Sequence, residues 1–333
     1  MGRFLAVIVL IGFLVANSAS GSEKQLLLDR LQKDSKDIDA LILLSRLELS
    51  ESNPKEAKRL KRLGLRYAKQ DIDRLRLRTL GVQIERMERN ASWALNEYKR
   101  GQRIKGAGDF SELHLAIAEV YMDNRDFDAA VEALSSSLRA DSQNNPRAED
   151  LFTHVQQIQL AKSLSGSEFI YSNSIARSEM AKLLMEELRV DQYLAATSRE
   201  ISGEISPQGL TDYSGSEFRK EILACNRFNL RSFKIVNGMF HPQRAMTRGE
   251  LAMLIEDILH AKFKISRTAF IGTKSPFFDV KSNATIFNAV MNSVSRGLLQ
   301  GSKEGAFEAD ASVSGAEAIL LMHNLKQLLR VNE

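Results

Sequence analysis

The sequence MTRGELA at residues 246–252 predicts the start of a helix, and it is present in three imperfect copies. Thr247 followed three residues later by Glu250 is the pattern of a capping box, in which the hydroxyl and the carboxylate satisfy two free backbone amides at the start of the helix. Met246 and Leu251 stand at the positions of a hydrophobic staple. Apolar residues then continue at helical spacing, so we expect a helix from about residue 248 to about residue 260.

The two other copies read IARSEMA at residues 175–181 and VSGAEAI at residues 313–319. Their glutamates, Glu179, Glu250 and Glu317, are 71 and 67 residues apart. Recurrence at such a period indicates a repeat architecture. The residues that we expect to cap the three helices are Thr247, Glu250, Ser314, Glu317 and Glu179.

Residues 22–145 have helical periodicity, and Ala57, Ala94 and Ala130 recur 37 and 36 residues apart. A small residue is needed where two helices cross closely. The clearest unit, residues 113–141, resembles a tetratricopeptide repeat, with Ala118 and Ala130 as its small packing residues and Tyr121 and Phe127 as its aromatic ones. The resemblance implies three helical repeats that hold a protein partner. A plain helical bundle is the alternative.

Residues 146–333 form three further units, at about 146–190, 210–260 and 276–329. The third contains, in order, Phe-Asp-Val at 278–280, Gly-Leu-Leu-Gln-Gly at 297–301, Gly-Ala-Phe at 305–307 and the copy at 313–319. This order resembles the S-layer homology domain, which usually occurs as three tandem copies. The resemblance implies an all-α module of three helical units in a pseudo-threefold arrangement, following the tetratricopeptide-like region.

The resemblance also implies a binding site for a cell-wall polymer, either peptidoglycan or a secondary wall polysaccharide that is often pyruvylated. The arginine of the repeated motif corresponds to Arg177 and Arg248, and the early aspartate of the domain corresponds to Asp212 and Asp279. A guanidinium recognises a carboxylate through two parallel hydrogen bonds, and a helix start favours an anion.

Three departures from the family pattern concern this site. Gly315 replaces the arginine in the third copy, Ala176 replaces the capping threonine in the first, and the His-Trp-Ala that follows the early aspartate is absent. An arginine in the first turn of a helix also sits unfavourably with the helix dipole. For Arg248 we therefore consider a contact with the wall ligand, a salt bridge within the module and a solvated side chain.

The first 21 residues read as a secretory signal peptide, with Arg3 before an apolar run at residues 4–16 and small residues after it. That run is shorter than the roughly 20 residues that a membrane-spanning helix needs, so we expect no integral span after cleavage. Cys225 is the only cysteine, which excludes an internal disulfide, and its apolar neighbours predict a buried, unreactive thiol.

The sequence contains no recognisable catalytic, cofactor or metal motif, and its five histidines are scattered. A net charge of +4 does not indicate a nucleic-acid binder. Residues 55–105 are locally basic, with 16 Lys or Arg against 6 Asp or Glu. This block either steers an anionic partner or forms a solvated helix face. We expect Trp93, the only tryptophan, to pack between helices.

These observations favour a noncatalytic, exported protein of the periplasm or cell envelope. In this hypothesis the second half binds the cell wall and the first half binds an unknown protein partner. The alternative is a periplasmic assembly scaffold whose degenerate second half makes only protein contacts.

Overall fold

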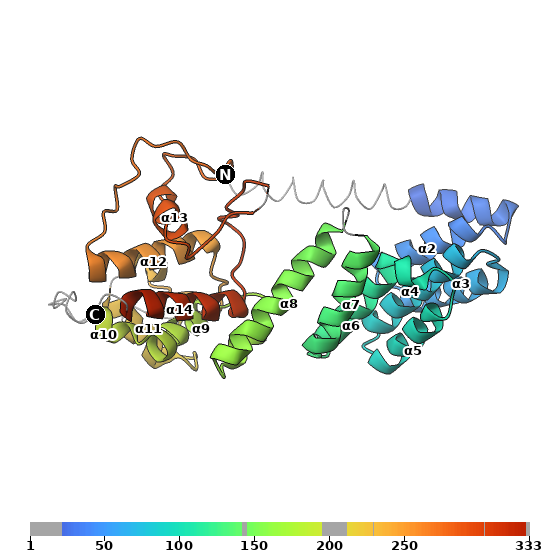
Figure 1. Ribbon diagram of the computed structural model, residues 1–333, viewed down its shortest axis with the longest axis horizontal. Helices are drawn as coiled ribbons and strands as arrows, with labels where there is room; N and C mark the ends of the chain where they lie inside the picture. The colour runs from blue at the N-terminus through green and yellow to red at the C-terminus, as the bar shows by residue number, and fades with distance from the viewer. Residues whose placement is uncertain (1–21, 142–144, 195–211, 229, 303, 331–333) are drawn as a thin grey trace. The chain divides into compact units, whose positions relative to one another are not determined.

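The computed structural model describes residues 22–141, 145–194, 212–228, 230–302 and 304–330, and these are helical with connecting turns (Figure 1). The described residues contain no β-strand, only isolated bridges, so the predicted all-α class is confirmed. The signal peptide that we expect at residues 1–21 lies outside the described residues. By its contacts the chain divides into two compact units, Met1–Gln156 and Gln157–Glu333, and the division falls within α8 (Pro146–Leu164). The boundary that we expect at residue 145 remains a prediction.

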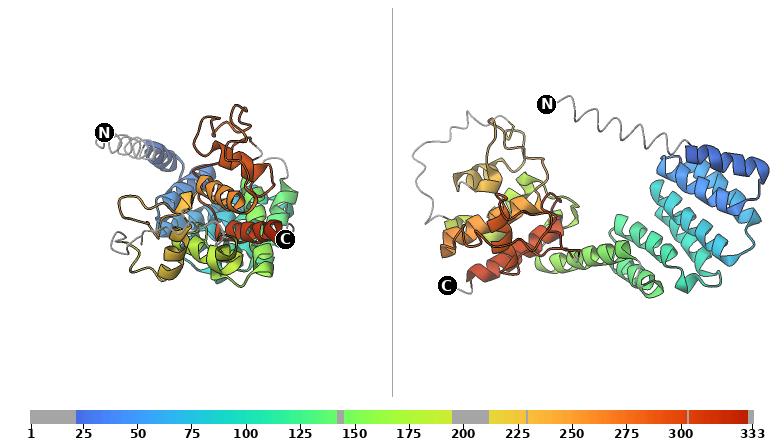
Figure 2. Two further views of the ribbon diagram at one scale, coloured as in Figure 1. Left: turned by 90° about the vertical axis from the view of Figure 1, so that its left-hand side faces the viewer. Right: turned by 90° about the horizontal axis from the view of Figure 1, so that it is seen from above.

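The N-terminal unit consists of successive helices joined by short turns, which lie side by side in Figure 1 and in the right-hand view of Figure 2. Residues 22–33 form a first helix. The next six pair as hairpins, α2 with α3, α4 with α5 and α6 with α7. Their bounds are α2 Ile38–Ser50, α3 Pro54–Tyr67, α4 Asp71–Met87, α5 Ala91–Gln102, α6 Ser111–Asp123 and α7 Phe127–Ala140.

The turn within each hairpin has the same backbone geometry. Ser52, Arg89 and Arg125 each have a positive φ, of 61°, 55° and 59°. The next residue is in each case the N-cap of the second helix, and its side chain accepts a hydrogen bond from a backbone amide of the first turn. These N-caps are Asn53, Asn90 and Asp126.

Small residues allow the helices of this unit to approach one another. Ala57, Ala94 and Ala130 are fully buried at equivalent positions of α3, α5 and α7. Seven residues further along, a Cβ added to Gly64 or to Gly101 would come within 2.8 Å of a leucine methyl group in the following hairpin. The region is therefore consistent with helical repeats, and its identity as tetratricopeptide repeats remains a prediction.

The C-terminal unit contains shorter helices and longer connecting loops. The predicted helix at the MTRGELA motif is α12, which begins at Arg248 and continues to Phe263. The other elements are η2 Glu168–Tyr171, α9 Arg177–Leu183, the π-helical turn η3 Leu184–Leu188, α10 Val190–Leu194, α11 Arg219–Arg227, η5 Arg231–Phe233, α13 Phe287–Val294 and α14 Gly315–Arg330.

A closed ring of backbone hydrogen bonds joins the three motif copies just before their helices begin. The amide of Ile175 donates to the carbonyl of Val313 (2.8 Å), that of Val313 to Met246 (3.0 Å), and that of Met246 to Ile175 (2.9 Å). All three side chains are fully buried. Residues more than 130 positions apart thus meet at one point of the core, and each copy contacts both others in the same way.

Two single-residue expectations have opposite outcomes. Cys225 is fully buried, so its expected burial is confirmed, and burial raises the pKa of its thiol. The expectation that Trp93 packs between helices is wrong, because its side chain in the first turn of α5 is 53% exposed. In the part of the chain that the structure describes, none of the helices has the length and apolar character needed to cross a membrane.

Candidate functional site

Asp212 and Asp279 hold two equivalent loops in the C-terminal unit. Asp279 accepts hydrogen bonds from the amides of Phe307 (2.7 Å) and Glu308 (2.7 Å). Asp212 accepts in the same way from Phe240 (2.8 Å) and from the residue after it (2.6 Å). Partial burial opposes ionisation of Asp279, but these backbone donors outweigh it and lower its pKa. The two aspartates therefore organise loops, and Asp279 keeps an exposed side.

Arg177 lies at the first position of α9 and is almost completely buried, with 4% of its side chain exposed. Its guanidinium donates to the carbonyls of Phe240 (2.9 Å), Ser232 and Lys234 (3.3 Å), and it lies over the Phe240 ring at 4.7 Å from the centroid. Burial lowers its pKa to about 10, so it remains protonated at neutral pH. Glu250 lies 3.5 Å away. Arg177 thus fastens the first motif copy to the loop of the second.

Arg248 makes the corresponding contacts one copy further along, but it is more accessible, with 14% of its side chain exposed. It donates to the carbonyls of Phe307 (3.1 Å) and Gln300 (2.6 Å), forms an ion pair with Glu317 and lies over the Phe307 ring at 5.1 Å from the centroid. Burial raises the pKa of Glu317, against the effect of Arg248. Of the three interpretations considered for Arg248, the structure shows the salt bridge within the module.

The structure therefore brings the four predicted ligand-binding residues together as two pairs. Arg177 and Asp212 bind the backbone of one phenylalanine, Phe240, on its carbonyl and amide sides. Arg248 and Asp279 do the same at Phe307. The sequence motifs contain both phenylalanines, but nothing in the spacing of the residues indicates that arginine and aspartate from different copies meet there.

The third copy lacks room for an equivalent arginine. A Cβ on Gly315 would lie 1.7 Å from the carbonyl oxygen of Phe169, so the helix start packs directly against backbone there. Glu179 is equivalent to Glu250 and Glu317, and its carboxylate accepts from the Ala176 amide at 2.7 Å. The sequence departure at Gly315 therefore coincides with a close backbone contact.

Hydroxyl caps and glutamates satisfy other amides at the helix starts. Thr247 and Glu250 exchange hydrogen bonds, with Glu250 N to Thr247 Oγ1 at 3.2 Å and Thr247 N to Glu250 Oε2 at 3.1 Å. Ser314 Oγ accepts from the Glu317 amide at 3.2 Å, while the Glu317 carboxylate pairs with Arg248 instead of returning to its own N-cap. Glu317 therefore joins two copies.

Carbonyls from a neighbouring copy accept the first amide of each of the three helices. The donors and acceptors, with their N···O distances, are Arg177 to Arg244 (3.0 Å), Arg248 to Ala311 (2.9 Å) and Gly315 to Ser172 (2.8 Å). An anion bound at a helix start uses such free amides. Since these three amides already have partners, they are not free to bind an anion.

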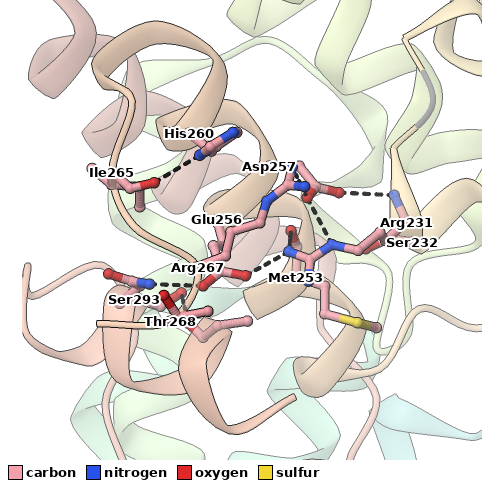
Figure 3. Close-up of polar contacts among 12 residues, drawn as sticks. Arg231, Ser232, Met253, Glu256, Asp257, His260, Ile265, Arg267, Thr268 and Ser293 are labelled. Atoms are coloured by element: carbon pink, nitrogen blue, oxygen red, sulfur yellow. Dashed lines mark hydrogen bonds and ion pairs between the residues drawn. The ribbon is translucent and has the colours of Figure 1, made fainter. Parts of the chain in front are cut away.

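The middle of α12 carries a charged network that no motif in the sequence predicted (Figure 3). Glu256 and Asp257 are 1% and 4% exposed. Arg231 donates to both carboxylates at 2.6–2.8 Å, and Arg267 donates to Asp257 at 2.8 Å. Asn292 of α13 donates to Glu256 at 2.7 Å. Two adjacent acidic residues inside the apolar run at 251–259 were the available signal, because buried carboxylates require partners.

A comparison with protein families matches the S-layer homology domain to residues 211–252 and 276–319, about a quarter of the chain. These segments contain the second and the third motif copies, with Asp212, Arg248 and Asp279. The first copy lies outside the match and remains a prediction. Curated proteins and solved structures provide no match to this chain. The chain therefore carries S-layer homology sequence, which is typical of exported proteins associated with the cell wall or cell surface.

Proposed function

We propose that the protein is a noncatalytic component of the cell envelope whose C-terminal unit binds a cell-wall polymer, either peptidoglycan or a secondary polysaccharide. The observation that carries the proposal is the repeated loop geometry within the two segments that match the S-layer homology domain. In this proposal the helical hairpins of the N-terminal unit hold a protein partner in the periplasm or at the cell surface.

The ligand-binding role centres on Arg248 and Asp279. Arg248 is partly exposed, and its guanidinium has five N–H donors, so a ligand carboxylate can bind beside Glu317 without displacing it. Asp279 is exposed beside the same loop and has an acceptor side for sugar hydroxyls. Arg177 and Asp212 form the equivalent pair, but the buried guanidinium of Arg177 makes it a structural clamp in this proposal.

A second candidate is a periplasmic assembly scaffold that has lost glycan binding. The extensive bonding of Arg177 within the unit and the close packing at Gly315 favour it, because neither copy then offers a cation to a ligand. Protein contacts would replace the wall as the function of the unit.

Sedimentation of the full chain with purified cell-wall sacculi distinguishes the two candidates. For a wall-binding protein we expect retention in the pellet, weaker retention of Arg248→Gln, and no change for Arg227→Gln, an exposed arginine in the last turn of α11. Circular dichroism verifies that each variant is folded. Wild-type protein that stays in the supernatant, with sacculi retaining or lacking their secondary polysaccharide, would end the wall-binding proposal. Equal retention of all three proteins would exclude Arg248 as the contact.

A further inference from the structure

A groove of about 410 Å³ crosses the second helices of the first two hairpins in the N-terminal unit. Its walls come from α3, α4 and α5, and we call it the α3–α5 groove. The volume falls within the roughly 300–1,000 Å³ that is typical of small-ligand sites. Most of its lining residues are polar, and its two apolar ones are Leu65 and Trp93.

The exposed indole of Trp93 forms part of this groove. Trp93, Glu97 and Arg100 follow one another at helical spacing of four and three residues, so they share one face of α5. An aromatic ring that is half exposed beside polar groups can stack on a flat, partly apolar ligand surface. The pyranose ring of a sugar offers such a surface.

The groove carries more positive than negative charge. Glu97 is already paired with Lys61 (2.9 Å) and Arg78 (2.8 Å), so its charge is compensated. Arg62 is exposed and forms no ion pair with residues that the structure describes, and Arg100 is exposed and lies 3.9 Å from Glu97. These two guanidiniums are therefore available to a carboxylate, which they bind in a planar, bidentate manner.

One wall of the groove contains a carboxylate oxygen, Oε2 of Glu85, that accepts no hydrogen bond from the described residues. Glu85 is 2% exposed, and its Oε1 pairs with Lys58 at 2.8 Å. Its Oε2 is buried and has no hydrogen-bond partner among the described residues. Lys58 also serves Glu88 at 3.0 Å, so its ammonium is shared. Glu85 is itself closed to a ligand, but the side chain of Lys58 is 27% exposed and can donate to a ligand hydroxyl.

We propose that the α3–α5 groove binds a carboxylate-bearing sugar of an acidic glycan, which stacks on Trp93 and places its carboxylate on Arg62 and Arg100. A hydroxyl of the sugar is directed to Lys58, which pairs with Glu85. An acidic peptide would also pair with the two arginines, but it lacks the flat pyranose face that stacks on Trp93. The site goes beyond the wall-binding function proposed for the C-terminal unit and does not depend on it.

The single tryptophan makes this proposal directly testable in the full chain. Selective excitation of tryptophan reports on Trp93 alone, since the sequence contains no other. We expect trigalacturonic acid to change the emission saturably, whereas neutral galactotriose should have little effect. Binding at the C-terminal unit would not produce this signal, so the two proposals can fail separately.

Charge reversal supplies the matched control. Arg62→Glu with Arg100→Glu should weaken the trigalacturonate response at least about tenfold, because two charge-assisted contacts are lost. Lys55→Glu with Lys99→Glu makes the same change in net charge at exposed residues outside the groove, and this variant should bind as wild type. An absent response, equal weakening in both double variants, or an equally strong response to hexaglutamate would overturn the proposal.

Discussion

Replacement of Arg177 by alanine tests whether this arginine is a structural clamp in the C-terminal unit. The side chain is 4% exposed and bonds to three backbone carbonyls of the next motif copy. Alanine has no side-chain donor, so the substitution removes all three of these hydrogen bonds. Water has little access to the site, so the carbonyls lose their partners. We therefore expect strong destabilisation of this unit with little effect on the N-terminal unit.

The expected magnitude follows from the contacts. Each buried acceptor left without a partner costs about 1–3 kcal/mol, and removal of one member of a buried ion pair costs about 3–5 kcal/mol. Glu250 keeps Arg244 as a second partner, which limits the electrostatic part of the loss. Contributions of groups that share one side chain are not additive, so we expect a total at the low end of their sum, about 3–5 kcal/mol. For a unit of this size that corresponds to a fall in Tm of roughly 6–20 °C.

Two spectroscopic probes separate the units during thermal or urea unfolding. Trp93 fluorescence follows the N-terminal unit alone, whereas far-ultraviolet circular dichroism follows the helices of both units. In Arg177→Ala the fluorescence transition should stay in place, and part of the dichroism change should move to lower temperature. Arg177→Lys should give an intermediate shift, because an ammonium keeps the charge but not the planar set of donors.

The exposed Arg227 provides the control for loss of an arginine in the same unit. Arg227→Ala should change the unfolding free energy by less than about 0.5 kcal/mol, as surface substitutions usually do. If Arg177→Ala unfolds together with Arg227→Ala, the clamp is disproved and the side chain is free for a ligand.

Three further predictions concern other parts of the chain. Gly315→Ala should destabilise the C-terminal unit by about 1–3 kcal/mol because its Cβ meets the Phe169 carbonyl, whereas Gly166→Ala, where nothing lies within 4 Å, should not; urea unfolding compares them. His114 has its pKa lowered by burial from the usual 6.5, so the unfolded chain binds the proton more readily. The stability of the N-terminal unit should therefore fall as the pH drops below about 6.5. His114→Asn should flatten this pH dependence when unfolding is followed by Trp93 fluorescence. If the unfolding free energy of the variant varies with pH as in the wild type, His114 is not the group responsible. The pKa of Asp279 is lowered in the folded protein. Its contribution to folding stability is therefore present above the usual aspartate pKa of 3.8 and is lost as the pH falls through the folded-state pKa. The free energies of unfolding of Asp279→Asn and of the wild type should therefore converge at low pH. A difference that stays constant with pH would show that ionised Asp279 is not its cause.

Local patterns determined the helical class and the positions of many helix starts. The alanines at 57, 94 and 130 lie at equivalent buried positions because a close helix crossing leaves no space for a larger side chain. The motif at residues 246–252 begins α12 at Arg248, since Thr247 and Glu250 satisfy amides within their own turn. These are short-range effects, so residue spacing alone is enough to predict them.

The tertiary structure decided what the charged residues do. Arg177 contacts residues 55–63 positions away, and Arg248 pairs with Glu317, 69 positions away. No periodicity within one motif specifies such a partner. The same applies to Trp93, whose exposure depends on how α3, α4 and α5 surround it. Side-chain identity shows that a guanidinium is present, but its burial and its available hydrogen-bond donors depend on residues that only folding brings beside it.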